Sequence, residues 1–426
     1  MSTALLTDRY ELTMLQAALR DGTAQRRCVF EAFSRRLPEG RRYGVVAGTG
    51  RLLAEIADFR FSDTELDFLR QRSVVDERTC AWLADYRFTG DIDGYAEGEL
   101  YFPGSPVLTV TAGFAEAVVL ETLILSVLNF DCAVAAAAAR MVYAAGRRPI
   151  IEMGSRRIHE QAAASSARAA YLAGFKATSN LAAGERYGVP TMGTSAHSWT
   201  LLHDAEADAF RAQVDAFGTG TTLLVDTYDI AAGIRTAIEV AGPALGAIRI
   251  DSGDLAVLAM QAREQLDALG ATGTKIVLSG DLDEYALAAL IAAPVDSYGV
   301  GTSVVTGSGA PSAGFVYKLV EVEGRPVAKR SEDKGSRGGG KSAVRRHRAT
   351  GTATEEVVTS QGRPAPQDGD RALQIPYCRQ GQPVPTPTLE QSRDHLRTVM
   401  GTVPWDALKL SRGEPAIPTR YEQGVR

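Results

Sequence analysis

Short apolar segments bounded by turn-forming residues recur through the middle of the chain. We expect these segments to be strands, because brief apolar runs between turn signals are typical of buried strands. They are Pro149–Met153, Pro190–Thr194, Thr222–Asp226, Ala247–Asp251, Lys275–Ser279 and Ser297–Gly301. Helical pattern separates them, as in Leu255–Leu269. This alternation predicts parallel βα units that form a barrel or part of one.

The N-terminal part has a different pattern, which predicts an α/β arrangement. Leu5–Ala18 has the apolar spacing of a helix, and Thr7 or Asp8 can cap that helix at its start. Cys28–Phe33 is apolar and predicts a strand. Tyr86–Pro106 alternates and is rich in glycine and aromatic residues, as expected for a small antiparallel layer.

Ala115–Ala145 is rich in alanine and leucine and almost free of helix breakers. We expect one or two buried helices here, with a break near 129–131. The apolar run Ala117–Leu128 contains Glu121 and is too short to cross a bilayer, so we expect no association with a membrane.

The βα rhythm stops after Phe315–Val322. Arg325–Arg348 follows and holds nine lysines and arginines, which fits either a solvated loop or a lid near bound phosphate. The remaining residues, rich in Pro, Gln and Thr, predict a subdomain with sparse helices such as Leu389–Val399. These shifts predict three domains, residues 1–114, 115–322 and 323–426.

Composition narrows the class of protein. A length of 426 residues exceeds one ordinary core, so two or three domains are expected. The formal net charge of −5 gives no reason to expect nucleic acid. Cys28, Cys80, Cys132 and Cys378 have no paired spacing, which argues against a disulfide framework or a zinc site and fits the cytoplasm.

Four of the predicted strands end in residues suited to bind phosphate. Arg156 and Arg157 follow one strand, and Arg249, Asp251 and Asp254 lie at the end of another. Two further ends carry the strings Ser279-Gly280-Asp281 and Gly301-Thr302-Ser303. Glycine lets a backbone approach a phosphate closely, and the last strands of a barrel commonly form a phosphate site. The residues alone therefore predict a barrel enzyme acting on a phosphorylated small molecule, with Asp254 more simply a helix N-cap.

The segment Gly188–Trp199 places Thr194, Ser195 and one histidine, His197, at a predicted strand end. A lone histidine is more often a structural residue than a catalytic one. The phosphate-type turns on the other strands make this histidine a candidate.

Seven motifs, in order along the chain, resemble the nicotinate phosphoribosyltransferase family. They cover roughly Leu5 to Val322, and the later residues match only loosely, around Lys334, Gly340 and Lys341. The motifs are Thr7-Asp8-x-Tyr10, Glu152–Arg157, Phe175–Asn180, Gly193-Thr194-x-Ala196-His197-Ser198, Arg249-x-Asp251-Ser252-Gly253-Asp254, Ser279-Gly280-Asp281 and Gly301-Thr302-Ser303-x-Val305-Thr306.

The resemblance implies an N-terminal α/β sandwich domain, an incomplete α/β (TIM-like) barrel and a C-terminal extension. It implies a homodimer with sites shared between subunits. It also implies the joining of nicotinate to 5-phosphoribosyl 1-diphosphate (PRPP), with Mg²⁺, to give nicotinate mononucleotide and pyrophosphate. This step of NAD biosynthesis is coupled in the family to ATP hydrolysis.

By resemblance, ATP phosphorylates His197. Thr194, Arg249 and Ser179 would contact nicotinate, with Tyr10 reaching in from the other subunit. The metal ligands stay unassigned. The residues that would bind PRPP are Arg156, Asp251, Ser279, Gly280, Asp281, Gly301 and Thr302.

One position departs from the family, and two other functions stay open. Met153 stands where the family often has an aromatic residue; its sulfur can still cover a ring, so we expect altered affinity rather than lost function. A nicotinamide- or quinolinate-using relative is one alternative; nicotinamide-using relatives carry an aspartate in place of Ser179. The other alternative is an inactive barrel that regulates a partner, against which the intact His197 and Arg249 count.

Overall fold

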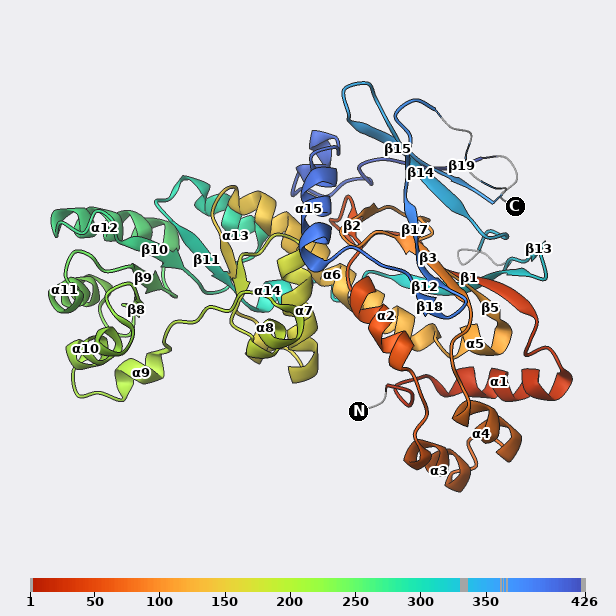
Figure 1. Cartoon of the computed structure of the whole chain (residues 1–426). Coiled ribbons are helices and arrows are strands. Elements are labelled where there is room, and N and C mark those ends of the chain that lie inside the picture. Colours follow the sequence, from red (N-terminus) through yellow and green to blue (C-terminus); the bar gives the residue numbers. More distant parts are fainter. Residues whose placement is uncertain (1–2, 330–335, 361, 363, 365–366, 423–426) are drawn as a thin grey trace. The chain divides into compact units, whose positions relative to one another are not determined.

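The computed structural model describes residues 3–329, 336–360, 362, 364 and 367–422, so Lys334 lies outside the described residues. The chain forms two compact units (Figure 1). The first unit is Met1–Ala136 with Ala310–Arg426, and the second unit is Ala137–Gly309. These units differ from the segments 1–114, 115–322 and 323–426, whose status as separate domains stays a prediction.

The first unit contains a seven-stranded antiparallel sheet in the order β13-β12-β1-β5-β3-β17-β18. β1 confirms the strand expected at Cys28–Phe33. Tyr86–Pro106 contains strands β3 and β4, but they do not form a layer of their own: β3 pairs antiparallel with β5 and β17, and β4 belongs to a separate pair. The bounds are β1 Arg27–Ser34, β3 Asp91–Tyr95, β5 Leu108–Gly113, β12 Phe315–Val322, β13 Arg325–Pro326, β17 Gln374–Arg379 and β18 Gln382–Pro383.

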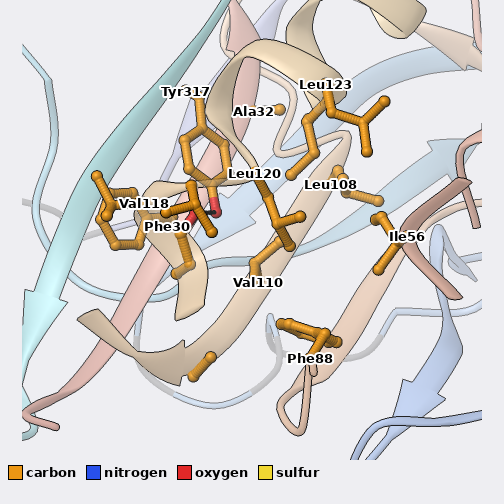
Figure 2. Close-up of a cluster of buried hydrophobic side chains, with 14 of the residues drawn as sticks. Phe30, Ala32, Ile56, Phe88, Leu108, Val110, Val118, Leu120, Leu123 and Tyr317 are labelled. Atoms are coloured by element: carbon orange, nitrogen blue, oxygen red, sulfur yellow. Dashed lines mark hydrogen bonds between the residues drawn. The ribbon is translucent and has the colours of Figure 1, made fainter. Parts of the chain in front are cut away.

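Helices pack on this sheet and enclose the core of the first unit. Figure 2 shows part of that core, where Phe30 and Tyr317 stack with ring centroids 4.8 Å apart. Leu12 and Leu15 lie on the helix predicted within Leu5–Ala18, which begins at Arg9, and both are buried in the same core. The helices are α1 Arg9–Asp21, α2 Thr49–Asp58, α3 Asp63–Gln71, α4 Glu77–Ala84 and α5 Phe114–Val118.

The long apolar helix α6 spans Glu121–Ala145, and the break lies before it, at 119–120, rather than near 129–131. The polar residues expected to break it have partners: Asp131 pairs with Arg51 at 2.9 Å, and Asn129 accepts a hydrogen bond from Phe315 N. Phe114–Ala145 is long and apolar enough to cross a membrane. Length therefore does not exclude a membrane span here, contrary to what the shorter run Ala117–Leu128 suggested. The most apolar window of Phe114–Ala145 is 67% buried, as in a core helix.

The second unit contains a six-stranded parallel sheet in the order β7-β6-β11-β10-β9-β8 (Figure 1). It curls into an incomplete barrel, and five of the six expected strands are present. The bounds are β6 Ile150–Glu152, β7 Ala177–Thr178, β8 Thr222–Leu224, β9 Ala247–Ile250, β10 Lys275–Leu278 and β11 Ser297–Val300.

The prediction of a strand at Pro190–Thr194 is wrong, because only a single β-bridge joins Thr191 to Thr178. Pro190 has no N–H for a ladder, and Met192, Gly193 and Thr194 are exposed, so the segment leaves the sheet early.

Helices connect the strands of the second unit. Asp254 caps α12 by accepting a hydrogen bond from Val257 N at 3.3 Å, as expected. The helices are α7 Glu160–Leu172, α8 Leu181–Tyr187, α9 His197–Leu201, α10 Glu206–Phe217, α11 Ile230–Ala241, α12 Leu255–Ala268, α13 Glu284–Ala289 and α14 Thr302–Val305, with the short 3-10 turns η1 Ser155–Arg157 and η2 Leu290–Ala292.

The C-terminal part is richer in strands than expected. Strand β14, Ser342–His347, lies inside the stretch interpreted as a basic loop or lid, and its Arg345 is 1% exposed. Lys341 is buried and pairs with Glu31 at 2.7 Å. The remaining elements are β15 Ala353–Thr359, β16 Arg371–Ala372 and β19 Thr419–Tyr421 in the order β16-β14-β15-β19, the pair β2 Gly44–Val45 and β4 Leu100–Tyr101, helix α15 Leu389–Met400 and turn η3 Trp405–Leu408.

Candidate active site

The carboxyl ends of the parallel strands surround a cavity of about 530 Å³, here called the rim cavity. It belongs wholly to the second unit. All residues predicted to bind PRPP line it, as do Thr194, Arg249 and Ser179. The lining residues are Met153, Ser155, Arg156, Arg157, Ser179, Gly193, Thr194, Ser195, Ala196, Arg249, Asp251, Ser279, Gly280, Asp281, Gly299, Gly301 and Thr302.

Arg249 is the partly buried cation of this cavity, with a side chain 13% exposed. It donates hydrogen bonds to Thr194 Oγ1 and, at 3.3 Å, to Ser195 O. Its Nε is buried and has no hydrogen-bond partner in the part of the chain that the structure describes. Burial lowers the pKa of Arg249, while the charges of Asp251 and Asp226 oppose that shift. The guanidinium is thus oriented and not fully satisfied, as a receptor for an anion would be.

Two carboxylates, those of Asp251 and Asp226, lie near the Arg249 guanidinium. Ser279 Oγ donates to Asp251 Oδ1 at 2.5 Å, and Asp251 lies 3.9 Å from the Arg249 guanidinium. Asp226, which the sequence analysis did not select, accepts hydrogen bonds from Asp251 N at 2.9 Å and Ser252 Oγ at 2.7 Å. Its position after β8 was the signal that could have identified it. Asp226 therefore fixes the start of the loop that carries Asp251.

Buried Glu152 organises the ends of β6 and β7. It accepts hydrogen bonds from Thr178 Oγ1, at 2.5 Å, and from Gly154 N. Its own carbonyl accepts a hydrogen bond from Ser179 N at 2.8 Å, which places Ser179 at the cavity. Burial raises the pKa of Glu152, and the hydrogen bonds from Thr178 and Gly154 counteract this.

Two glycines of the cavity are required by their geometry. Gly280 has φ +126°, a conformation that residues with a side chain rarely adopt. A Cβ at Gly301 would lie 3.2 Å from Met153 O, so a side chain there would press on the end of β6. Both turns hold backbone close to the cavity, as a phosphate cradle would require.

His197 is the first residue of α9 and is half-buried. Its Nδ1 lies 3.1 Å from Thr227 Oγ1, a partner that the sequence analysis missed. Among the described residues, the lining of the rim cavity reaches Ala196 and stops short of the imidazole. The structure therefore brings His197 to the same rim but not into the cavity wall.

Tyr10 belongs to the first unit and is 46% exposed. Burial of part of the ring and the nearby Glu121 carboxylate raise the pKa of its hydroxyl, which hydrogen-bonds to Glu121. The phenol thus stays neutral and exposed enough to meet another molecule.

Over the described ranges, no group of three or more His, Cys, Asp or Glu side chains could hold a metal ion. Mg²⁺ needs no such group when substrate phosphates supply ligands, because one or two carboxylates then suffice. Asp251 and Asp281 offer carboxylates at the rim cavity.

Comparisons with known proteins give one consistent result. The family model described as nicotinate phosphoribosyltransferase N-terminal domain matches residues 5–129, and the model of the nicotinate phosphoribosyltransferase family matches residues 149–350. Nicotinate phosphoribosyltransferase pncB1 of Mycobacterium tuberculosis is 62% identical over 98% of this chain and 94% of its own length. That of Bacillus subtilis is 39% identical over 76% of this chain and 67% of its own.

Solved structures agree at the level of the fold. The crystal structure of human nicotinic acid phosphoribosyltransferase matches with a TM-score of 0.86 at 26% identity, covering 98% of both chains. A nicotinate-nucleotide pyrophosphorylase from Pyrococcus furiosus matches with a TM-score of 0.79 at 23% identity, over 94% of this chain and 95% of that one.

Proposed function

Because the chain belongs to the nicotinate phosphoribosyltransferase family, we propose that its rim cavity joins nicotinate to the anomeric carbon of PRPP. The C–O bond to pyrophosphate breaks, a C–N bond to the pyridine nitrogen forms, and nicotinate mononucleotide is released. This reaction recovers nicotinate for NAD synthesis.

The environment of Arg249 is the observation that favours nicotinate, an acid, over the neutral nicotinamide as the substrate. Its guanidinium lines the cavity, is held by Thr194 and Ser195, and keeps a buried Nε without a partner among the described residues. A carboxylate would supply the missing acceptor with a charge-assisted hydrogen bond, which a neutral amide cannot match. Ser179 lies on the same cavity and adds no negative charge that would repel the acid.

The remaining lining residues suit PRPP. Arg156 is exposed beside the cavity and can pair with phosphate, and the backbone at Gly280 and Gly301 leaves room for phosphate oxygens. Asp251 is held by Ser279 and Asp226, so it can accept hydrogen bonds from ribose hydroxyls without moving. The protein thereby positions the two reactants, which lowers the entropic cost of reaction. Mg²⁺ fits here, with Asp251 or Asp281 beside the substrate phosphates, where it would neutralise charge on the leaving pyrophosphate.

ATP coupling would pass through His197. With Nδ1 facing Thr227, Nε2 is the ring nitrogen available to accept the γ-phosphoryl group of ATP. The proposal places this imidazole at the rim, next to Ala196 of the cavity wall.

The second copy of a homodimer would complete the site with Tyr10, and light scattering on the purified protein tests that assembly. The four cysteines are buried and unpaired, which supports a reducing compartment such as the cytoplasm.

The direct experiment mixes purified protein with nicotinate, PRPP and Mg²⁺, with and without ATP, and measures nicotinate mononucleotide and ADP. The proposal expects product in both reactions, faster with ATP, and ADP release that depends on nicotinate and PRPP. Absence of nicotinate mononucleotide under both conditions would overturn it.

A further inference from the structure

A second cavity of about 800 Å³ lies on the inner face of the same sheet, and we call it the lumen. It is lined by residues from the starts of the strands, including Ile151, Ala247, Lys275 and Ser297. Lys275 is paired in register with Ala247, and Val277, which also lines the lumen, is paired with Arg249 of the rim cavity. Because side chains alternate along a strand, the two cavities are successive layers of one face.

The lumen is open because of its residues. A closed α/β barrel fills its interior with layers of branched side chains, so it has no internal space. Here the sheet has six strands, and the layer below the rim carries small residues at Gly220, Gly246, Ala247 and Ser297. A volume of about 800 Å³ is in the range of sites that enclose small ligands.

Two cations lie in this otherwise largely apolar wall. Lys176 and Lys275 are the only lysines in the sequence from 137 to 309, and both line the lumen. The one acidic residue of the lining, Asp296, accepts a hydrogen bond from Ile276 N at 2.7 Å. The balance of charge in the lumen therefore favours an anion.

The lumen and the rim cavity share Met153, Gly193 and Thr194. Thr194 accepts a hydrogen bond from Arg249, so the two cavities meet beside the guanidinium to which the proposed function assigns the carboxylate of nicotinate. Gly193 and Thr194, two of the three residues that the cavities share, are exposed.

From these observations we propose that the lumen is a second ligand site, for a flat aromatic anion larger than nicotinate. The apolar wall takes the aromatic body, and Lys176 and Lys275 bind the anionic group. An occupant would adjoin Met153 and Thr194 and so oppose the binding of nicotinate; that consequence alone rests on the proposed function.

The fluorescent probe 8-anilinonaphthalene-1-sulfonate has this chemistry and tests the site directly by titration. We expect saturable binding of one molecule per chain. Lys176→Gln with Lys275→Gln should weaken it about tenfold or more, because two charge-assisted contacts are lost. Ala244→Trp, at an exposed lining position, should abolish it by filling the space, and Lys409→Gln, in the first unit, should leave it unchanged.

Near-ultraviolet circular dichroism checks that each variant is folded. Absence of binding to the wild type, or binding that persists equally in the lysine variant and in Ala244→Trp, would overturn the proposal. In an activity assay, the probe should raise the KM for nicotinate in the wild type and not in Ala244→Trp. A protein that binds the probe in this pattern but makes no nicotinate mononucleotide would reject the proposed function and keep the lumen site.

Discussion

His197 directs Nδ1 toward Thr227 Oγ1, 3.1 Å away, which leaves Nε2 for a phosphoryl group. We predict that His197→Asn abolishes acid-labile protein phosphate and ADP release, while slow uncoupled formation of product remains. Thr227→Val should slow phosphorylation about fivefold, the effect of one lost hydrogen bond of about 1 kcal/mol. Phosphate that still appears on His197→Asn would contradict the assignment.

Gly301 approaches the end of β6 closely, with a Cβ position only 3.2 Å from Met153 O. Gly301→Val should raise the KM for PRPP about tenfold or more, because the side chain occupies space next to the predicted phosphate site. Gly220→Val is a matched control, since a Cβ there would meet nothing within 4 Å. An unchanged KM in Gly301→Val, measured by initial rates, would remove this turn from the site.

At the scale of elements, Glu152 ties β6 to β7 through Thr178. Burial raises its pKa in the folded protein above the ordinary value of 4.5. Its stabilising contribution is therefore complete below about pH 4.5 and is lost as the pH rises through the raised folded pKa.

Glu152→Gln keeps an amide oxygen as acceptor and removes this titration. We predict that, from pH 4.5 toward neutrality, the free energy of unfolding of the wild type falls relative to that of Glu152→Gln. Urea denaturation at several pH values measures the difference. A difference that does not change with pH would show that Glu152 does not titrate in this range.

Strand ends were the most predictable elements because a buried parallel strand has a local signature. Short apolar runs such as Ala247–Ile250 and Lys275–Leu278 stand out in the sequence, and the small or charged residues after them fall at one rim. The failures have local causes too. Thr191 makes only a bridge, and β7 is two residues long, too short to leave a pattern.

Partners distant in sequence were not predictable. Thr227 and Asp226 acquire their importance only from His197 and Asp251, which lie 30 and 25 residues away. Ten of the predicted site residues line the rim cavity, and they could be selected because they follow strands or match motifs of the family. The residues that hydrogen-bond to them could not be selected, because the curl of the sheet decides which strand ends lie side by side.

At the scale of the whole molecule, the first unit joins both ends of the chain. Glu99 pairs with Arg345 at 2.6 Å and with Arg371 and His395, and Arg345 also pairs with Glu356 at 2.6 Å. Burial would raise the pKa of Glu99, but the charges of Arg345 and Arg371 and the hydrogen bonds from Arg371 and His395 outweigh it and hold the pKa well below its usual range. Composition predicted either a solvated loop or a lid near bound phosphate for the basic stretch that holds Arg345, because charge alone does not reveal that a partner is buried beside it.

We predict that Arg345→Met lowers the free energy of unfolding by about 3 kcal/mol or more, because the buried carboxylates of Glu99 and Glu356 lose the cation that they share. Arg70→Met, which breaks exposed pairs with Asp67 and Glu77, is the control and should leave stability almost unchanged. Urea denaturation measures both. Equal stability of the two variants would show that the buried cluster does not hold the first unit together.

The central claim is that Arg249 selects an acid at the rim cavity. The most direct test compares the catalytic efficiency for nicotinate and nicotinamide in the wild type, Arg249→Gln and Ser179→Asp. We predict a strong preference for nicotinate in the wild type, which narrows about tenfold to a hundredfold in Arg249→Gln and also narrows in Ser179→Asp. A wild type that uses nicotinamide equally well, or a preference that survives both changes, would contradict the account.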